Sequence, residues 1–250
     1  MMDILAGRRA VVTGAAGGIG GAIARAYARE GARLLLADRD GARLQAVADE
    51  CASHGADVES VEADLGEVAG ADRCIETCVR RYGGIDILVN NAGLLTQALC
   101  TDLTVEMWDD MLRVDLRSVF LCTRRALPGM VAQRWGRVIN TASQLGIKGG
   151  AELSHYAAAK AGVIGFTKSV ALEVSQHNVL VNAIAPGPIR TPMVDGISES
   201  WKQAKAAELP LRRFGEPDEI APTAVLLASD PGGNLYCGQT LGPNSGDVMP

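Results

Sequence analysis

The sequence contains few aromatic residues, few histidines and no regular spacing of cysteines. Aromatic residues make up 4% of the 250 positions, and only three residues are histidine. The six cysteines are Cys51, Cys74, Cys78, Cys100, Cys122 and Cys237. Cys74 and Cys78 are i,i+4 neighbours on an expected helix, but no histidine or further cysteine follows at metal-ligand spacing. We therefore expect reduced thiols packed among apolar groups, and no metal site.

Neither an excess of positive charge nor a long apolar run is present. The 24 basic residues are outnumbered by 29 acidic ones, which gives a net charge of −5. This balance argues against a nucleic-acid partner and against binding to an anionic membrane. The chain has no run of about 18 apolar residues, and its opening MMDILAGRRA lacks the basic-then-apolar pattern of a signal peptide. The expectation is a soluble, cytoplasmic protein.

Apolar residues and glycine are abundant and follow an alternating pattern. Hydrophobic residues make up 48% of the chain, and 29 residues are glycine. Short apolar runs such as RRAVVTG and GIDILVNNAG alternate with helical stretches, including long helices expected over about 104–134 and 154–176. Apolar strands that alternate with helices indicate a parallel sheet covered on both faces, with ligands bound beyond the carboxyl ends of its strands. The prediction is a single α/β domain over residues 1–250, in which the less regular region at about 188–215 forms a substrate lid.

The motif TGAAGGIG, residues 13–20, lies between the first expected strand and the first expected helix. Gly14, Gly18 and Gly20 permit a tight turn, so that backbone amides and the positive end of the helix face an anion such as a pyrophosphate. Asp38 follows Gly20 by 18 positions, where a carboxylate accepts hydrogen bonds from the hydroxyls of an adenosine ribose. That carboxylate repels a 2′-phosphate and predicts NAD as the cofactor rather than NADP, although Arg39 favours the phosphate.

Further motifs follow in an order that resembles the short-chain dehydrogenases/reductases of about 250 residues, over nearly the whole chain. They are TGAAGGIG, ADL at 63–65, NNAG at 90–93, Ser143, YAAAK at 156–160 and PGPIRTP at 186–192. The resemblance implies a doubly wound Rossmann-type sheet of about seven parallel strands, a bound nicotinamide dinucleotide, and reversible oxidation of a secondary alcohol to a ketone. The sequence is similar in this general way to 3-oxoacyl-thioester reductases and to secondary-alcohol dehydrogenases, and does not choose between them.

The resemblance also implies which positions contact the dinucleotide. They are Gly14, Gly18, Ile19, Gly20, Asp38, Asp64, Leu65, Asn91, Ala92, Gly93, Tyr156, Lys160, Pro186, Gly187, Ile189 and Thr191. Asp64 and Leu65 would contact the adenine, and the NNAG segment would pass beneath the adenosine ribose. Ile189 and Thr191 would bond the nicotinamide carboxamide.

The stretch YAAAK places Tyr156 and Lys160 at i and i+4, on one face of a helix. A free phenol titrates near ~10, and a nearby ammonium lowers the pKa of such a phenol. Tyr156 is therefore the expected acid/base, and the family position assigns Ser143 to holding the substrate oxygen beside it. YxxxK alone is a common coincidence, but the surrounding motifs argue against chance here. A catalytically silent nucleotide-binding protein of the same fold is the alternative interpretation, against which the intact Ser143, Tyr156 and Lys160 argue.

The chain departs from the family pattern at Asp115, where the family usually has Asn. Its backbone carbonyl would still hold a proton-relay water, so we expect Asp115 to belong to the catalytic group. An ionised Asp115 would hold Lys160 charged and oppose ionisation of Tyr156; the other interpretation is that Asp115 only interrupts the long helix. The ending LGPNSGDVMP also differs from the usual family tail.

The substrate is expected to be a small alcohol or ketone, bound by Ser143, Gln144, Leu153 and Tyr156. The segment IKGGAELSH would either receive a polar ketone or form a solvated rim. By family analogy, and because the two long helices carry many apolar residues, the chain is expected to form a homotetramer.

Overall fold

The computed structural model of the chain describes residues 3–194 and 198–249. Within these residues, seven parallel strands form one sheet in the order β3-β2-β1-β4-β5-β6-β7. The strands are β1 (Arg9–Thr13), β2 (Arg33–Asp38), β3 (Val58–Glu62), β4 (Ile87–Asn90), β5 (Gly136–Thr141), β6 (Val179–Ile184) and β7 (Thr240–Leu241). The sheet confirms the predicted α/β class and the expected number of strands.

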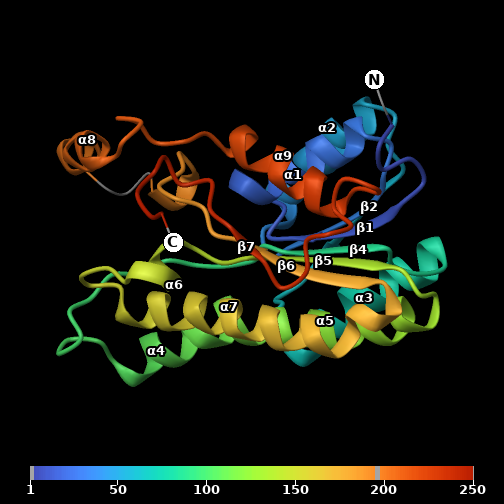
Figure 1. The fold of residues 1–250 in the computed structure, drawn as a ribbon, viewed down its shortest axis with the longest axis horizontal. Helices are drawn as coiled ribbons and strands as arrows, with labels where there is room; N and C mark the ends of the chain where they lie inside the picture. Colours follow the sequence, from blue (N-terminus) through green and yellow to red (C-terminus); the bar gives the residue numbers. More distant parts are fainter. Residues whose placement is uncertain (1–2, 195–197, 250) are drawn as a thin grey trace.

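Helices cover both faces of the sheet (Figure 1). One face carries α1 (Gly18–Arg29), α2 (Gly41–Ser53) and α9 (Pro217–Ala228), and the other carries α3 (Val68–Tyr82), α5 (Ser118–Ala132) and α7 (Ser154–Val174). Successive residues of a strand point to opposite faces, so each strand supplies both cores. Val12 and Leu34 pack into the core beneath α1, for example, whereas Val11 and Leu35 pack against α3.

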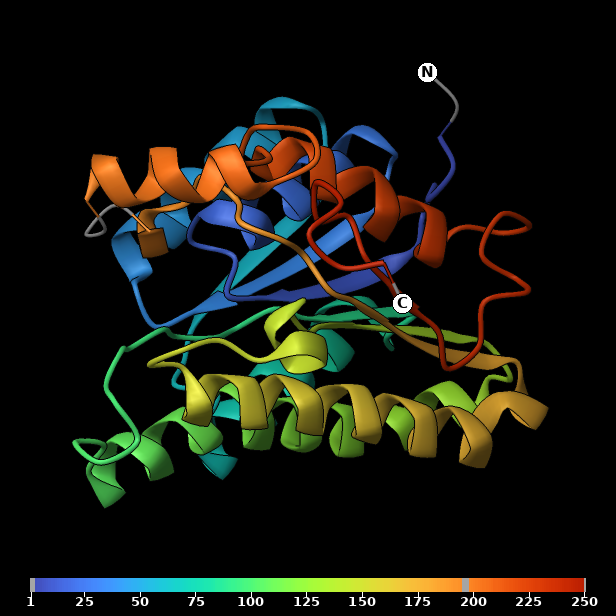
Figure 2. The ribbon, with the colours of Figure 1, turned by 60° about the vertical axis from the view of Figure 1, so that its left-hand side comes forward.

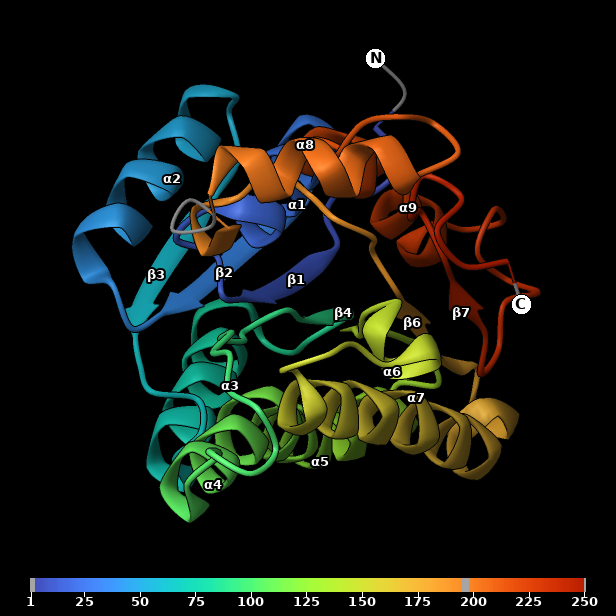
Figure 3. The ribbon, with the colours of Figure 1, turned by 90° about the vertical axis from the view of Figure 1, so that its left-hand side faces the viewer.

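The order of the strands determines where a ligand binds. From β1 the chain winds through β2 and β3 toward one edge, and then returns to β4 and winds through β5 and β6 toward the other. The connections therefore separate at the carboxyl ends of β1 and β4, where parallel sheets of this kind bind their ligands. Figure 3 looks onto this edge, with α8 (Glu199–Glu208) above it and α6 (Leu145–Lys148) below it.

The stretch from about 104 to 134 is not the single regular helix that the sequence predicts. The chain passes from α4 (Val105–Leu112) through a π-helical turn, Arg113–Arg117, into α5. The side chain of Thr104 caps the start of α4 by accepting a hydrogen bond from the amide of Met107. A π-helical turn inserts a residue into the helical ladder, and such turns are frequent at functional sites. Here the turn contains Asp115, whose side chain is completely buried.

The second long helix agrees with its prediction. Helix α7 is followed by a 3₁₀ turn over Ser175–His177, which completes the expected range of 154–176. Two elements at the carboxyl edge were not predicted as helices. They are α6, directly after β5, and α8, which lies within the region interpreted as a lid and begins after the capping residue Ser198. That region also includes residues 195–197, which lie outside the described residues; before them, Pro192–Val194 forms a 3₁₀ turn.

Candidate active site

A cleft of about 880 Å³ opens at the carboxyl ends of the strands. Its walls come from the turn before α1, the ends of β2, β4 and β5, the start of α7, the segment after β6, and α8. Figure 2 shows α8 on the α1 side of the sheet and the short helix α6 on the other side. Residues far apart in the sequence therefore meet at one place, as the motifs predicted.

The glycine-rich turn is shaped by close backbone contacts. Gly14 has φ +64°, and a Cβ at this position would lie 2.8 Å from the Cα of Ala92. A Cβ on Gly20 would collide with the carbonyl oxygen of Gly14. Helix α1 starts at Gly18 without a side-chain cap. Its first N–H groups therefore remain available to an anion in the cleft, which Gly14, Gly18 and Ile19 line.

The NNAG segment is tied to this turn by hydrogen bonds. The hydroxyl of Thr13 accepts bonds from the amides of Asn91 and Ala92, at 2.9 and 3.1 Å. Asn91 Nδ2 donates to the carbonyl of Gly14 at 3.1 Å, and Thr141 Oγ1 donates to Asn91 Oδ1 at 3.2 Å. Asn91 and Gly93 line the cleft. Thr13 was not among the predicted residues, and only its place at the end of the first strand could have indicated this role.

Asp38 stands at the end of β2 and lines the cleft. Its carboxylate accepts hydrogen bonds from the amides of Ala16, at 3.0 Å, and Asp40, at 3.1 Å. These bonds fix one oxygen toward the glycine-rich turn and leave lone pairs for further donors. Arg39 and Arg43 line the same end of the cleft. Arg43 therefore adds a second cationic side chain at this end, beside the Arg39 that was considered from the sequence.

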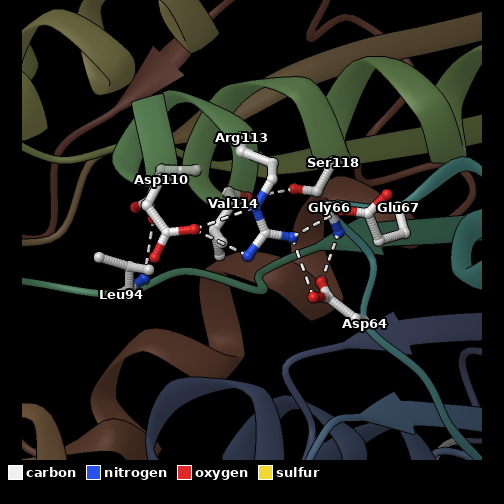
Figure 4. A network of polar contacts seen from close by, with 9 residues as sticks. Asp64, Gly66, Glu67, Leu94, Asp110, Arg113, Val114 and Ser118 are labelled. Carbon is white, nitrogen blue, oxygen red and sulfur yellow. Dashed lines mark hydrogen bonds and ion pairs between the residues drawn. The ribbon is translucent and has the colours of Figure 1, made fainter. Parts of the chain in front are cut away.

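Asp64 and Leu65, expected to contact the adenine, lie outside the lining of the cleft as the described residues shape it, and that role stays a prediction. Leu65 is 4% exposed. The carboxylate of Asp64 accepts hydrogen bonds from Gly66 N and from Arg113 Nη1, both at 2.9 Å. Arg113 also pairs with Glu67 and Asp110 (Figure 4). The guanidinium thus connects the segment after β3 to the π-helical turn that holds Asp115.

The residues predicted for catalysis converge at the middle of the cleft. Tyr156, Lys160, Ser143 and Asp115 all line it. Lys160 Nζ lies 5.6 Å from the centre of the Tyr156 ring and 3.1 Å from Asp115 Oδ2, and it donates to the carbonyl of Thr141 at 3.0 Å. Asp115 Oδ1 accepts from the amide of Leu94 at 2.8 Å. Ser143 Oγ accepts from the amide of Leu145 at 3.1 Å, which fixes the hydroxyl at the end of β5.

The electrostatics correct one expectation of the sequence. Burial raises the pKa of Tyr156 above its ordinary value, although Lys160 and a hydrogen bond with Ser143 act to lower it and Asp115 raises it further. Burial opposes the charge of Lys160, but Asp115 and Tyr156 raise the pKa of its ammonium. Burial also raises the pKa of Asp115, and Lys160 offsets part of that rise. The expected lowering by Lys160 is present, but the cost of burying a phenolate exceeds it.

The segment IKGGAELSH, residues 147–155, is largely exposed up to Glu152 and buried only at its end. His155 is fully buried, its Nε2 lies 2.8 Å from Thr96 Oγ1, and burial lowers its pKa. Lys148 makes an ion pair with Asp247 in the C-terminal tail at 2.6 Å. Gln144 and Leu153, the expected substrate contacts, both line the cleft. The contacts of Asp247 were not predicted, because no local motif in the sequence indicates them.

The segment after β6 closes the far side of the cleft. Pro186, Gly187, Ile189 and Thr191 line it, as predicted. Gly187 approaches the tail so closely that a Cβ there would lie 2.6 Å from the Cα of Asn244. Thr191 reaches back to the glycine-rich turn, since its Cγ2 would be 3.3 Å from a Cβ on Gly18. The cleft therefore runs without interruption from the end of β2 to Ser143 and Tyr156.

These features fit a dinucleotide. Glycines fill positions that a Cβ would obstruct, an uncapped helix start faces the cleft, and a carboxylate stands at the end of the second strand. The first two suit a pyrophosphate, and the third suits ribose hydroxyls.

Comparisons with known proteins agree with this geometry. Residues 8–202 match the family model for short chain dehydrogenase. The 3-oxoacyl-acyl-carrier-protein reductase FabG of Aquifex aeolicus is 40% identical over 227 residues, which cover 90% of this chain and 92% of that protein. The FabG reductase of Thermotoga maritima is 38% identical over 245 residues, 98% of this chain and 99% of the relative.

Solved structures agree equally well. A short-chain type dehydrogenase/reductase from Mycobacterium marinum superposes with a TM-score of 0.95 and 32% identity, over 100% of this chain and 98% of that one. Levodione reductase gives a TM-score of 0.92 with 34% identity and covers 96% of both chains. The likeness therefore extends from the sequence motifs to the whole fold.

Proposed function

The chain belongs to the short-chain dehydrogenase family and is an NAD(P)-dependent oxidoreductase of CH–OH groups, and we propose that it interconverts a secondary alcohol and a ketone with Tyr156 as acid and base. The observation that carries the proposal is the placement of Tyr156, Lys160 and Ser143 around one point of the cleft, with Asp115 behind the lysine. The intact set argues against the alternative of a catalytically silent protein of the same fold.

In the proposed mechanism, Tyr156 handles the proton. During oxidation its phenolate takes the hydroxyl proton of the alcohol, and during reduction its phenol returns a proton to the carbonyl oxygen. A nicotinamide dinucleotide held in the cleft would supply or accept the hydride at the substrate carbon. Lys160 keeps a positive charge beside the phenol, and so stabilises the phenolate relative to the neutral form.

Ser143 and Asp115 complete the proposed group. The hydroxyl of Ser143 holds the substrate oxygen beside the phenol and stabilises the charge that develops on it. Asp115 keeps Lys160 protonated and in place, because Lys160 is bound between that carboxylate and the carbonyl of Thr141. Gln144 and Leu153 contact the substrate from the wall of the cleft, and α8 covers the substrate end as a lid.

We propose NAD as the preferred cofactor. The residues proposed to hold it are Gly14, Gly18, Ile19, Gly20, Asp38, Asn91, Ala92, Gly93, Tyr156, Lys160, Pro186, Gly187, Ile189 and Thr191. Asp38 supports the preference, because its carboxylate accepts ribose hydroxyls and repels a 2′-phosphate. Arg39 and Arg43 at the same end are the observation that favours NADP as the second candidate.

The proposed substrate is a small ketone or alcohol, such as a 3-oxoacyl derivative. The supporting observations are the likeness to the 3-oxoacyl-acyl-carrier-protein reductases and a cleft that is lined by both polar and apolar residues near Ser143. No helix within the described ranges has both the length and the apolar character to cross a membrane.

A homotetramer in the cytoplasm is part of the proposal. The outer surface of α5 and α7 exposes Phe120 and Leu172, of which Leu172 is 83% exposed. Symmetric oligomers commonly bury surfaces of this kind. All six cysteines are free, and Cys74, Cys78 and Cys122 are buried near one another without bonding, which suits a reducing compartment.

A panel of secondary alcohols and ketones tests the function. Each compound is assayed with NAD(H) and NADP(H) in parallel, by the absorbance of the reduced nicotinamide. The proposal expects turnover of at least one 3-oxo compound and a higher kcat/KM with NADH than with NADPH. Binding of NADH without turnover of any compound would favour the silent protein instead.

A further inference from the structure

The C-terminal tail brings a carboxylate to the substrate end of the cleft. Asp247 accepts hydrogen bonds from Lys148 Nζ and Gln144 Nε2, each at 2.6 Å. Lys205 Nζ lies 3.3 Å from the same carboxylate. The three donors belong to two segments: Gln144 is the N-cap of α6 and Lys148 its last residue, whereas Lys205 lies on α8. The side chain of Asp247, which is only 11% exposed, therefore joins α6 to α8.

The tail holds Asp247 in a defined position. Gly246 has φ +82°, and its amide donates to Asn244 Oδ1 at 3.0 Å. A Cβ on Gly246 would lie 2.8 Å from Pro210, directly after α8. Asn244 Nδ2 donates to the carbonyl of Val248 at 2.8 Å, so this side chain fixes the tail on both sides of Asp247. The carboxylate is thus held in place behind the residues that line the cleft, and is not carried by a free end.

Asp247 changes the charge that the wall presents to a ligand. Lys148 and Lys205 both line the cleft. Lys205 has a second carboxylate partner, Glu208 at 3.1 Å, whereas the ion pair of Lys148 among the described residues is with Asp247. Burial favours the neutral acid, yet the bonds from the two lysines lower the pKa of Asp247. An ionised Asp247 therefore cancels a cationic wall that would otherwise attract an anion.

Asp247 also determines how Gln144 is presented. A carboxylate can only accept, so the Gln144 amide must direct its NH₂ group toward Asp247. Its Oε1 is buried and has no partner within the described part of the chain. Gln144 directly follows Ser143 and lines the cleft. The bond to Asp247 therefore fixes the orientation of the Gln144 side chain and engages the NH₂ group that could otherwise bind a carboxylate.

We infer that Asp247 is a specificity-determining residue that makes the cleft select ketones with an uncharged substituent, such as esters, thioesters and amides, over ketones that carry a free carboxylate. The inference rests on the proposed function and names the substrate class of that site. Asp247 acts in two ways: it pairs with Lys148 and shares Lys205 with Glu208, and it engages the NH₂ group of Gln144.

The test compares one ketone in two charge states. Ethyl acetoacetate and acetoacetate share the same ketone and differ in whether the far end is an ester or a carboxylate. We expect the wild-type enzyme to have the higher kcat/KM for the ester. In Asp247→Asn, which keeps the size and one acceptor oxygen, the ratio of kcat/KM for acetoacetate to that for the ester rises about tenfold, because Lys148 loses its counter-charge.

Two further variants separate charge from disturbance of the fold. Adding Lys148→Gln to Asp247→Asn removes the unmatched cation and returns the ratio toward the wild-type value. Glu199→Gln removes a carboxylate that pairs with Lys202 at 2.8 Å on α8, outside the cleft, and leaves the ratio unchanged. An unchanged ratio in Asp247→Asn, or a wild-type preference for acetoacetate, overturns the inference while the proposed function stands. Failure to reduce any ketone of the panel counts against the proposed function itself.

Discussion

The Nζ atom of Lys160 lies 3.1 Å from Oδ2 of Asp115, and the two side chains are 4% and 0% exposed. A carboxylate in this place adds a charge that the Asn usual in the family does not have. This charge forms an ion pair with Lys160. It also raises the pKa of Tyr156, which lies on the same helix α7 as Lys160. Both effects are measurable.

Asp115→Asn is expected to move the rising limb of the pH profile for alcohol oxidation to lower pH. Oxidation needs the phenolate of Tyr156. Because Asp115 raises the pKa of Tyr156, removing its charge lowers that pKa, and the phenolate then forms at lower pH. The maximum rate should stay within about tenfold, equivalent to ~1.4 kcal/mol of barrier.

The measurement is kcat against pH with one alcohol, for the wild type and the variant. Asp109→Asn is the control, since Asp109 is an exposed carboxylate on the neighbouring helix α4. An unchanged profile in Asp115→Asn would mean that the carboxylate does not act on Tyr156, and the electrostatic role of Asp115 would be abandoned.

Arg113→Met is expected to weaken NADH binding more than it lowers kcat. Arg113 holds Asp64 and Asp110 together, and so positions the segment after β3 relative to the π-helical turn. A loss of about three- to tenfold in affinity, ~0.7–1.4 kcal/mol, is expected for a partly exposed network. The dissociation constant is measured by quenching of NADH fluorescence.

Arg125→Met provides the matched comparison for this variant. Like Arg113, Arg125 joins two segments by ion pairs: it links α5 to α3 through Glu76 at 2.9 Å and Asp72 at 3.6 Å. It lies away from the cleft. If both variants changed NADH affinity equally, the effect would be a general loss of stability and not a role for Arg113 in positioning.

Asp38→Ser is expected to shift cofactor preference toward NADP. The change removes the charge that repels a 2′-phosphate and leaves Arg39 and Arg43 in place at the same end of the cleft. The ratio of NADPH to NADH affinities should rise at least about tenfold. Asp57→Ser, at the opposite end of the sheet, should leave the ratio unchanged. Tighter binding of NADPH than NADH by the wild type would refute the proposed preference.

Light scattering is expected to give a mass four times the 26.2 kDa of one chain. Leu172→Glu should lower that mass, because it places a charge on the exposed apolar surface of α7. Leu235→Glu is the control: Leu235 is 97% exposed but lies in the loop before β7. A wild-type mass near that of one chain would rule out the tetramer.

The sequence predicted the fold well because its signals are local and repeated. Apolar strands, helical stretches and glycine turns alternate at regular intervals, and each is confirmed by an element of the sheet or its covering layers. The π-helical turn at Asp115 could not be predicted in the same way. Residues 104–134 have a continuous helical composition, and the extra residue is seen only in the backbone hydrogen bonds.

The site was predicted where motifs are contiguous and missed where contacts are long-range. YAAAK and the glycine-rich motif TGAAGGIG are each a short run of consecutive residues. Asp247 reaches Gln144 from 103 positions away, and Arg113 reaches Asp64 from 49 positions away. The pKa of Tyr156 was misjudged for a related reason, because the i+4 lysine is visible in the sequence but the desolvation of the phenol in the folded chain is not.

Replacement of Tyr156 by Phe tests the proposed chemistry most directly. Phenylalanine keeps the ring and removes the hydroxyl that takes and returns the proton, so kcat for the best ketone of the panel should fall by at least about 100-fold. NADH affinity should stay within about threefold, and Tyr236→Phe, outside the cleft, should keep the wild-type rate. A Tyr156→Phe enzyme that retained most of its turnover, with NADH bound normally, would contradict the assignment of Tyr156 as the acid and base.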